Sequence, residues 1–385
     1  MSRLVAAALL TILCLPQARA PRPGMDRERL ARIRPRMEEF VRAGTIAGAV
    51  TLVARHGVVA SLEAVGYQDL ESRKPMRADT IFQVASMTKP VAAAGIMILL
   101  EQGRLVLLDP MEKHLPEFQG APAGRITVQH LLTHTSGIDG EDPPEVRGDR
   151  GKLALTLAEF VALVARRPLQ PKPGATYRYS GTGYAVLGRI IEVVSAQPLE
   201  KFLEERIFGP LGMKDTFFFP PAETRGRIAS VFRLQDGRLK RADVDLHREG
   251  ARYANAAGGL FSTASDIAAF HQMMLNGGTY RGARVLSKAS VEIMTQVHTG
   301  DLPVGSSPGV GYGLGWMVVR GPQNGMPLAA AGSFGHSGAL GTYGWVDPSK
   351  DLIGVFMTQI IGGRGAERHA FMAMAAAAVS ESDHE

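Results

Sequence analysis

The chain has 385 residues, 45% of them hydrophobic and 21% charged, and a formal net charge of +6. This is an ordinary globular composition, and the length suits one large domain or two fused ones. Basic residues are spread among acidic ones, as in DRERLARIRPRMEEF, which is typical of a solvated helix face. We therefore expect no nucleic-acid partner.

Residues 1–20 have the pattern of a secretory signal peptide. Arg3 precedes an apolar run over residues 4–15, and Ala-Arg-Ala at 18–20 matches a cleavage site. The run is shorter than the ~20 residues that span a bilayer. We expect cleavage after residue 20, export to the periplasm or medium, and no stable membrane span. Cleavage would remove Cys14, the only cysteine, and with it any disulfide, zinc-thiolate site or thiol nucleophile.

The periodicity of apolar residues predicts the remaining elements. In chain order they are a helix at 26–43, two strands within 47–66 that turn at His56-Gly57, an apolar helix from Ser86 to Gly103, mostly helices from about 104 to 215, a helix at 263–278, strands beyond 310 and a helix at 366–380.

Strands at both ends with helices between them predict an α/β fold, in which an antiparallel sheet is flanked by helices and carries a mainly helical lobe. We expect a single catalytic domain over 21–385. Its sheet lobe would comprise about 26–103 and 280–381, and its helical lobe about 104–279. A cleft between two lobes is the natural place for chemistry.

Ser86 and Lys89 stand three residues apart at the start of the apolar helix. On a helix such residues share a face, with their Cβ atoms ~5–6 Å apart. A serine hydroxyl needs a base to become a nucleophile, and a buried lysine with a lowered pKa can act as that base. The alternative is a helix-capping serine beside a lysine that reaches solvent. Ser-x-x-Lys alone does not decide between them, because a chain of this length contains about one by chance.

Two later motifs favour the catalytic interpretation. Tyr179-Ser180-Gly181 precedes an apolar helix, and FGHSGALGTYGWV contains a glycine-rich entry to a strand. With these motifs the chain resembles the serine β-lactamase family, above all its class C branch, the D-Ala-D-Ala carboxypeptidases and the related serine esterases. The resemblance covers nearly all of the mature chain and includes HLLTHTSGI, FGPLGMKDTFF and AGGLFSTASD, which look like family signatures without catalytic atoms.

The resemblance implies a role for each matching residue. Ser86 would be the acylated nucleophile, and Lys89 and Tyr179 would transfer protons, with the tyrosine phenolate favoured by the neighbouring ammonium. The oxyanion hole would be formed by the backbone N–H groups of Ser86 and Ala339. The residues expected to line the substrate strand are His336, Ser337 and Gly338.

The chain departs from the lactamases at two positions. Gly181 replaces an asparagine that contacts the substrate amide, and His336 replaces a lysine that helps to hold a carboxylate. A histidine with an ordinary pKa of ~6.5 is mostly uncharged near neutral pH. Both losses favour esters over β-lactams and peptides.

Three other patterns suggest different chemistry. Tyr253-Ala254-Asn255 spells Tyr-x-Asn, but its position is wrong, and we interpret it as a loop flanking the cleft. His130 and His134 lack the glutamate of H-E-x-x-H and a third ligand, so we expect packing or capping, and no metal. GHSGA at 335–339 resembles a nucleophile elbow, yet a strand and turn follow it where that elbow requires a helix.

The sequence thus predicts an exported serine hydrolase, of carboxylesterase type, that acts on a small ester or amide without a cofactor. One alternative is a β-lactamase or a D-amino-acid carboxypeptidase or transpeptidase with the same fold. Another is a binding module that has lost catalysis, which the intact set of Ser86, Lys89 and Tyr179 disfavours. The natural substrate and the oligomeric state stay open.

Overall fold

A computed structural model describes residues 24–120, 126–146, 148–168, 172–244, 249–305, 308–321 and 328–380. The expected signal peptide and Cys14 lie outside these residues.

The centre of the fold is an eight-stranded sheet in which every neighbouring pair of strands is antiparallel. In spatial order its strands are β10 (Val310–Tyr312), β11 (Met317–Val319), β12 (Phe334–Ser337), β13 (Tyr343–Asp347), β14 (Leu352–Met357), β1 (Gly48–Arg55), β2 (Val58–Asp69) and β3 (Lys74–Pro75). β1 pairs with β14 so that Val50 lies opposite Met357. The prediction that both ends of the chain build one sheet is confirmed.

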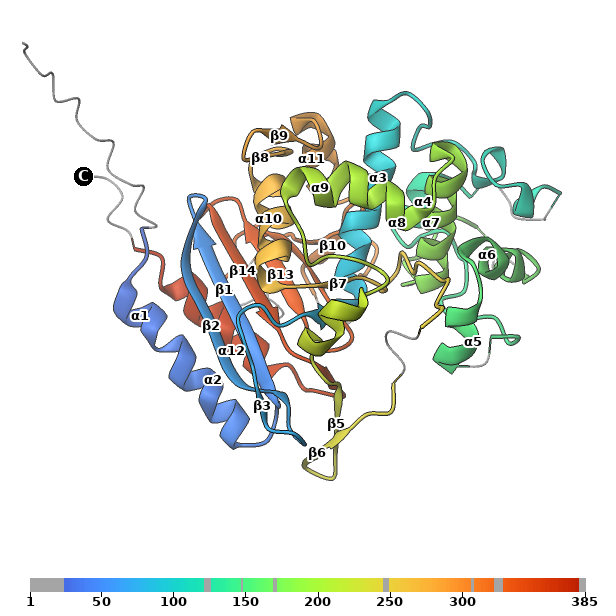
Figure 1. Cartoon of the computed structure of the whole chain (residues 1–385). Coiled ribbons are helices and arrows are strands. Elements are labelled where there is room, and N and C mark those ends of the chain that lie inside the picture. Colours follow the sequence, from blue (N-terminus) through green and yellow to red (C-terminus); the bar gives the residue numbers. More distant parts are fainter. Residues whose placement is uncertain are drawn as a thin grey trace, which may run out of the picture.

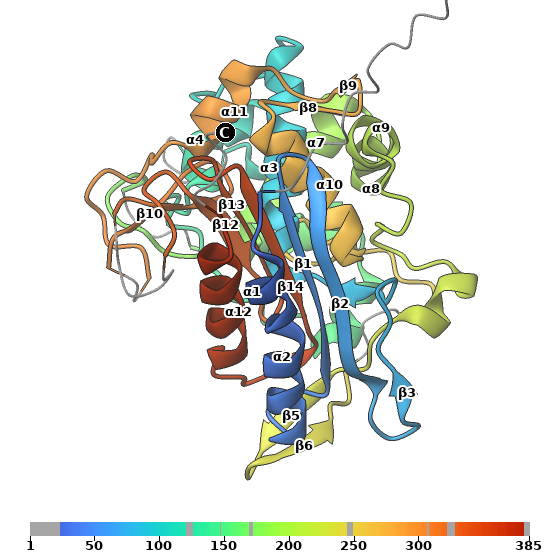
Figure 2. The ribbon, with the colours of Figure 1, turned by 90° about the vertical axis from the view of Figure 1, so that its left-hand side faces the viewer.

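Three helices cover one face of this sheet: α1 (Arg27–Ala31), α2 (Ile33–Arg42) and α12 (Ala366–Ala377). Figure 2 shows α2 and α12 side by side against the strands. Ile33 and Met37 of α2 and Phe371 of α12 pack into the same core cluster as inward residues of β1 and β14. The three- and four-residue spacing that predicted the first helix therefore marks its buried face.

The other face carries α3 (Thr88–Glu101) and α10 (Ala264–Leu275), beyond which lies the helical lobe (Figure 1). α3 is buried from Thr88 to Leu99, as expected of a helix that is apolar all round. The lobe contains α4 (Val128–Leu132), α5 (Gly148–Ala154), α6 (Leu157–Ala165), α7 (Gly181–Ser195), α8 (Leu199–Leu203), a π-helical turn (Glu204–Phe208) and α9 (Gly209–Leu211).

The structure corrects the expected lobe boundaries in two places. α10, assigned to the helical lobe, packs on β1, β13 and β14. A hairpin of β5 (Phe232–Gln235) and β6 (Arg238–Arg241) joins β15 (Ile360–Ile361) in a second sheet. The sequence carried the signal for this hairpin, since Asp236 and Gly237 both adopt the positive φ that an Asp-Gly turn requires.

The smaller elements are the strand pairs β4 (Phe82–Gln83) with β7 (Phe261–Ser262) and β8 (Thr279–Tyr280) with β9 (Ala283–Arg284), and the helix α11 (Lys288–Thr295). Within the described ranges, no helix combines the length and hydropathy needed to cross a bilayer.

Candidate active site

Ser86 lies in a 3-10 turn, Ala85–Met87, that leads directly into α3. Ala85 has φ 48°, a left-handed conformation that is unusual for a residue with a Cβ. Thr88 holds the turn, because its hydroxyl donates to Ala85 O at 2.7 Å and accepts from Leu260 N–H at 3.2 Å. Ser86 itself stays half-buried. The serine is therefore presented at the surface of an otherwise buried turn.

Lys89 is 1% exposed and points its amine at the serine. Lys89 Nζ lies 3.0 Å from Ser86 Oγ and donates to Ala257 O at 2.7 Å. Burial, with a smaller contribution from the charge of Lys152, lowers the pKa of Lys89 from 10.5 to about 7. Near neutral pH the amine can thus be uncharged and accept the Ser86 proton, as the catalytic interpretation required.

The carbonyl oxygen that accepts from Lys89 belongs to Ala257, the first residue of AGGLFSTASD (257–266). That segment resembles a family signature without catalytic atoms. In its tight turn, Ala257 N–H donates to Asn255 Oδ1 at 3.0 Å, and Asn255 O accepts from Gly258 and Gly259. Sequence reasoning missed this role of Ala257, because a backbone carbonyl leaves no residue-type signal. The neighbouring Tyr253 is 4% exposed and packs on Phe160, which supports excluding it as the catalytic tyrosine.

Tyr179 reaches the site from the segment before α7. Its ring centre lies 4.6 Å from Lys89 Nζ and 4.3 Å from that of His134, with the two ring planes tilted by 37°. Although 43% of Tyr179 is exposed, burial of its phenol raises its pKa to about 12, opposed by a hydrogen bond with Ser86. This raised pKa does not favour the phenolate that the resemblance implied, so Lys89 is the stronger candidate base, and the neutral Tyr179 hydroxyl can donate a proton.

The end of β12 closes against the nucleophile turn. A Cβ at Gly338 would lie 2.0 Å from Thr342 Oγ1 and 2.5 Å from Val84 O, so only glycine fits there. Thr342 also donates to Val84 O at 2.9 Å. This approach brings the backbone of Gly338 and the adjoining Ala339 to the turn that holds Ser86. The two N–H groups assigned to the oxyanion hole thus come from neighbouring segments.

His336 and Gly181 occupy the two positions where the chain departs from the lactamases. His336 is 3% exposed, with Nδ1 2.8 Å from Ser337 O and Nε2 3.0 Å from the Tyr312 hydroxyl. Burial, aided by the charge of Lys89, lowers the pKa of His336 to about 3. Gly181 begins α7, and a Cβ there would fit in ordinary van der Waals contact, 3.8 Å from the nearest atom, Ala257 Cβ.

The metal and elbow interpretations find no support. His130 Nδ1 accepts from Thr127 N–H in a capping box, and His134 is fully buried. No group of three or more potential metal ligands exists among the described residues. GHSGA runs from β12 through a turn into β13, without the helix of a nucleophile elbow.

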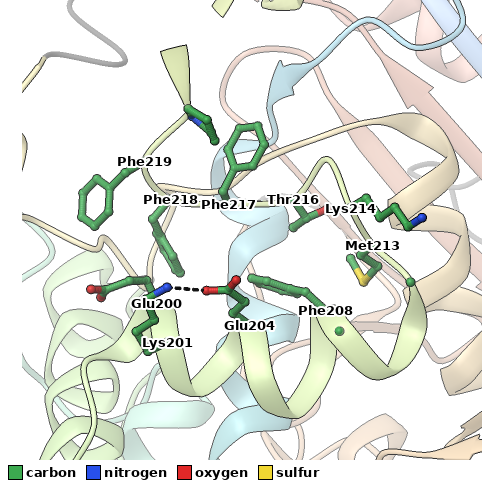
Figure 3. A pocket seen from close by; sticks show the side chains of 13 residues that line it. Glu200, Lys201, Glu204, Phe208, Met213, Lys214, Thr216, Phe217, Phe218 and Phe219 are labelled. Atoms are coloured by element: carbon green, nitrogen blue, oxygen red, sulfur yellow. Dashed lines mark hydrogen bonds and ion pairs between the residues drawn. The ribbon is translucent and has the colours of Figure 1, made fainter. Parts of the chain in front are cut away.

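The cavity in Figure 3 lies away from these residues. Its volume is about 620 Å³, and it is lined by Phe208, Met213 and Phe217–Phe219, with an ion pair of 2.8 Å between Lys201 and Glu204. Neither Ser86 nor Lys89 lines it. This cavity is therefore separate from the candidate active site.

Comparison with known proteins assigns the chain to a family. The Beta-lactamase family model matches residues 32–379, so the chain belongs to the beta-lactamase family. Protein Rv1367c of Mycobacterium tuberculosis is 35% identical over 84% of this chain and 88% of its own length. Esterase EstB of Burkholderia gladioli is 30% identical over 85% of this chain and 90% of its own. The solved structure of EstCE1, a hydrolase with promiscuous acyltransferase activity, superposes with a TM-score of 0.78 at 25% identity, covering 92% of this chain and 99% of that one.

Proposed function

We propose that the protein is an exported carboxylesterase that cleaves small carboxylic esters through an acyl-enzyme on Ser86. Relatives named as an esterase and as a hydrolase support the reaction class. Export is proposed from the signal-peptide pattern of residues 1–20.

The observation that carries the ester preference is the environment of His336. Both of its ring nitrogens are engaged inside the protein, by the Tyr312 hydroxyl and by Ser337 O. Its pKa of about 3 leaves it neutral at any physiological pH. A substrate carboxylate would therefore find no positive charge at this position. Since a charge-assisted hydrogen bond contributes roughly 1.5–3 kcal/mol, its loss disfavours carboxylate-bearing lactams about ten- to a hundredfold.

In the proposed reaction Lys89 takes the proton of Ser86, and Oγ attacks the ester carbonyl carbon. The N–H groups of Ser86 and Ala339 would stabilise the oxyanion. The C–O bond to the alcohol then breaks, the alkoxide takes a proton from Tyr179, and Lys89 returns a proton to the phenolate. Water attacks the acyl-enzyme by the same route in reverse and releases the acid.

The test is a paired assay on one preparation, in which kcat/KM is measured for p-nitrophenyl butyrate and for nitrocefin. Ser86→Ala serves as the blank for non-enzymatic turnover. We expect the ester to be preferred by at least about tenfold. A preference for nitrocefin would replace this proposal by the β-lactamase alternative. If neither substrate turns over and a fluorophosphonate probe does not label Ser86, the binding-module alternative takes its place.

A further inference from the structure

A line of buried hydrogen bonds runs beneath the candidate site. Ser180 N–H donates to His134 Nδ1 at 3.0 Å, and His134 Nε2 lies 3.2 Å from the Tyr312 hydroxyl. That hydroxyl lies 3.0 Å from His336 Nε2, and His336 Nδ1 lies 2.8 Å from Ser337 O. The three side chains are at most 3% exposed. Solvent therefore does not supply alternative partners for them.

The two backbone groups at its ends fix the direction of every bond in this line. An amide N–H can only donate, so His134 Nδ1 accepts and the ring carries its proton on Nε2. A carbonyl can only accept, so His336 carries its proton on Nδ1 and accepts at Nε2. The Tyr312 hydroxyl then accepts from His134 and donates to His336. In this arrangement every buried polar atom of the line has a partner, which a low-dielectric interior strongly favours.

The line requires both histidines to be neutral, since each must accept one hydrogen bond. Burial lowers the pKa of His134 well below its ordinary value, and the charges facing it are Lys89 and, if protonated, His336. Burial and the charge of Lys89 also lower the pKa of His336, to about 3, against the opposing effect of its hydrogen bond with Ser337 O. Tyr177, Tyr179 and Tyr184, which also surround the line, have raised pKa values and stay uncharged.

The two ends of the line belong to opposite walls of the site. Ser180 caps α7 through its side chain and directly follows Tyr179. Ser337 ends β12, two residues before Ala339. The line thus joins the wall of the helical lobe that carries the proton donor to the strand that carries the oxyanion donor.

We propose that His134, Tyr312 and His336 form a positioning relay that sets the separation of Tyr179 from Ala339 across Ser86. They are positioning residues, because none of them is assigned a contact with the reacting atoms. The proposal deepens the proposed function and rests on it for its catalytic consequence, whereas the bond pattern of the relay stands independently.

The first test concerns the bond pattern and needs no turnover. The relay predicts opposite tautomers for its two histidines, Nε2–H in His134 and Nδ1–H in His336. Long-range ¹H–¹⁵N correlation spectra of the uniformly ¹⁵N-labelled mature protein report the tautomer, with both rings assigned through their contacts to Tyr312. Opposite tautomers that persist between pH 5.5 and 8 support the relay. Identical tautomers, or protonation of either ring in this range, would overturn it.

The second test separates positioning from simple structural support. Tyr312→Phe removes the central hydroxyl and leaves the ring in place. The control is Tyr184→Phe, because Tyr184 is also fully buried, its ring centre lies 5.5 Å from Lys89 Nζ, and its hydroxyl, which neighbours that of Tyr312, donates to Leu132 O at 2.9 Å, so its loss leaves the four bonds of the relay in place. Tyr312→Phe loses two buried hydrogen bonds and Tyr184→Phe loses one, so we expect the larger loss of thermal stability in Tyr312→Phe, and stability alone does not test positioning.

Their kinetics should differ. Tyr312→Phe is expected to lower kcat for p-nitrophenyl butyrate roughly ten- to a hundredfold with KM within about threefold of wild type, because misplacement of catalytic groups acts on the chemical step. Tyr184→Phe should keep kcat within about threefold. Equal kcat losses in the two variants would show that Tyr312 contributes only to packing and does not position the catalytic groups. If the wild type hydrolyses no ester, the proposed function fails, while the tautomer pattern still decides the relay.

Discussion

The amine of Lys89 is held by the carbonyl oxygen of Ala257, 2.7 Å away, while it faces Ser86 Oγ. A neutral carbonyl orients the amine without adding the negative charge that would raise its pKa. No carboxylate among the described residues contributes to the pKa of Lys89, which burial lowers to about 7. The site therefore combines fixed geometry with a base that is available near neutral pH.

Ser86→Ala should abolish ester turnover and labelling by a fluorophosphonate probe while the fold persists, because no other described hydroxyl faces Lys89 at hydrogen-bond distance. Circular dichroism and probe labelling measure the two outcomes. Ser337→Ala is the control, since it changes the serine of the elbow-like GHSGA and should still be labelled. Loss of labelling in Ser337→Ala alone would show that the nucleophile has been misassigned.

The rate of acylation should rise with pH along one limb centred near pH 7. The pKa of Lys89 is lowered to about 7, so the amine is protonated below this pH and cannot accept the Ser86 proton. Single-turnover labelling from pH 5 to 9 measures the limb. Tyr179→Phe should lower the rate and keep the limb near pH 7. A limb that moved with Tyr179→Phe would instead make the tyrosine the base.

Lys89 and Tyr179 should act as one proton-transfer unit. Each single variant, Lys89→Met or Tyr179→Phe, is expected to lower kcat by about three powers of ten, and the double variant by little more, because groups that act together are non-additive. The comparison requires kcat for all three variants on p-nitrophenyl butyrate. Losses that multiply in the double variant would assign the two residues to separate steps.

Lys89→Met should stabilise the fold most at low pH. The folded pKa of Lys89, about 7, lies below its ordinary 10.5, so between these pH values the unfolded chain binds more protons and wild-type stability rises with pH. At pH 6 the wild type buries an ammonium, and its removal should add roughly 2–4 kcal/mol to the free energy of unfolding. By pH 10 most of this gain should be gone.

Urea unfolding of both proteins at pH 6 and pH 10 provides the measurement. Lys288→Met changes a lysine whose side chain is 81% exposed, so it should show no such pH-dependent difference. A constant difference between wild type and Lys89→Met at both pH values would mean that the lysine keeps an ordinary pKa in the fold.

Gly338→Ala should lower kcat by roughly a hundred- to a thousandfold, because the new methyl group would displace β12 from the nucleophile turn and misplace an oxyanion donor. Gly226→Ala is the control, since a Cβ there would meet nothing within 4 Å and Gly226 lies outside the candidate site. Burst-phase kinetics with p-nitrophenyl butyrate measure acylation in both variants. Similar rates in the two would show that Ala339 N–H contributes little to the oxyanion hole.

The sequence was most informative where a side chain or its spacing carries the signal. The apolar period of Leu30, Ile33 and Met37 predicted an amphipathic helix. Residue types and their spacing also predicted that strands from both ends of the chain form one sheet and that Lys89 lies beside Ser86.

What the sequence could not reveal depends on the folded environment. The Ala257 carbonyl has no residue-type signal, and the pKa of Tyr179 is set by burial that only tertiary packing creates. His134 and His336 are far apart in the chain and meet only through Tyr312, so the spacing of the histidines could not connect them.

Because Val50 in β1 pairs with Met357 in β14, the centre of the sheet can form only after most of the chain has been synthesised. During synthesis Ser86 and Lys89 emerge early, yet the strand that completes the centre of the sheet follows β1 by about 300 residues. Ala339 is synthesised shortly before that strand. The nascent chain therefore contains Ser86 and Lys89 long before the N–H group of Ala339 can lie beside that of Ser86. The proposed reactivity of Ser86 therefore requires nearly the whole domain to have been synthesised.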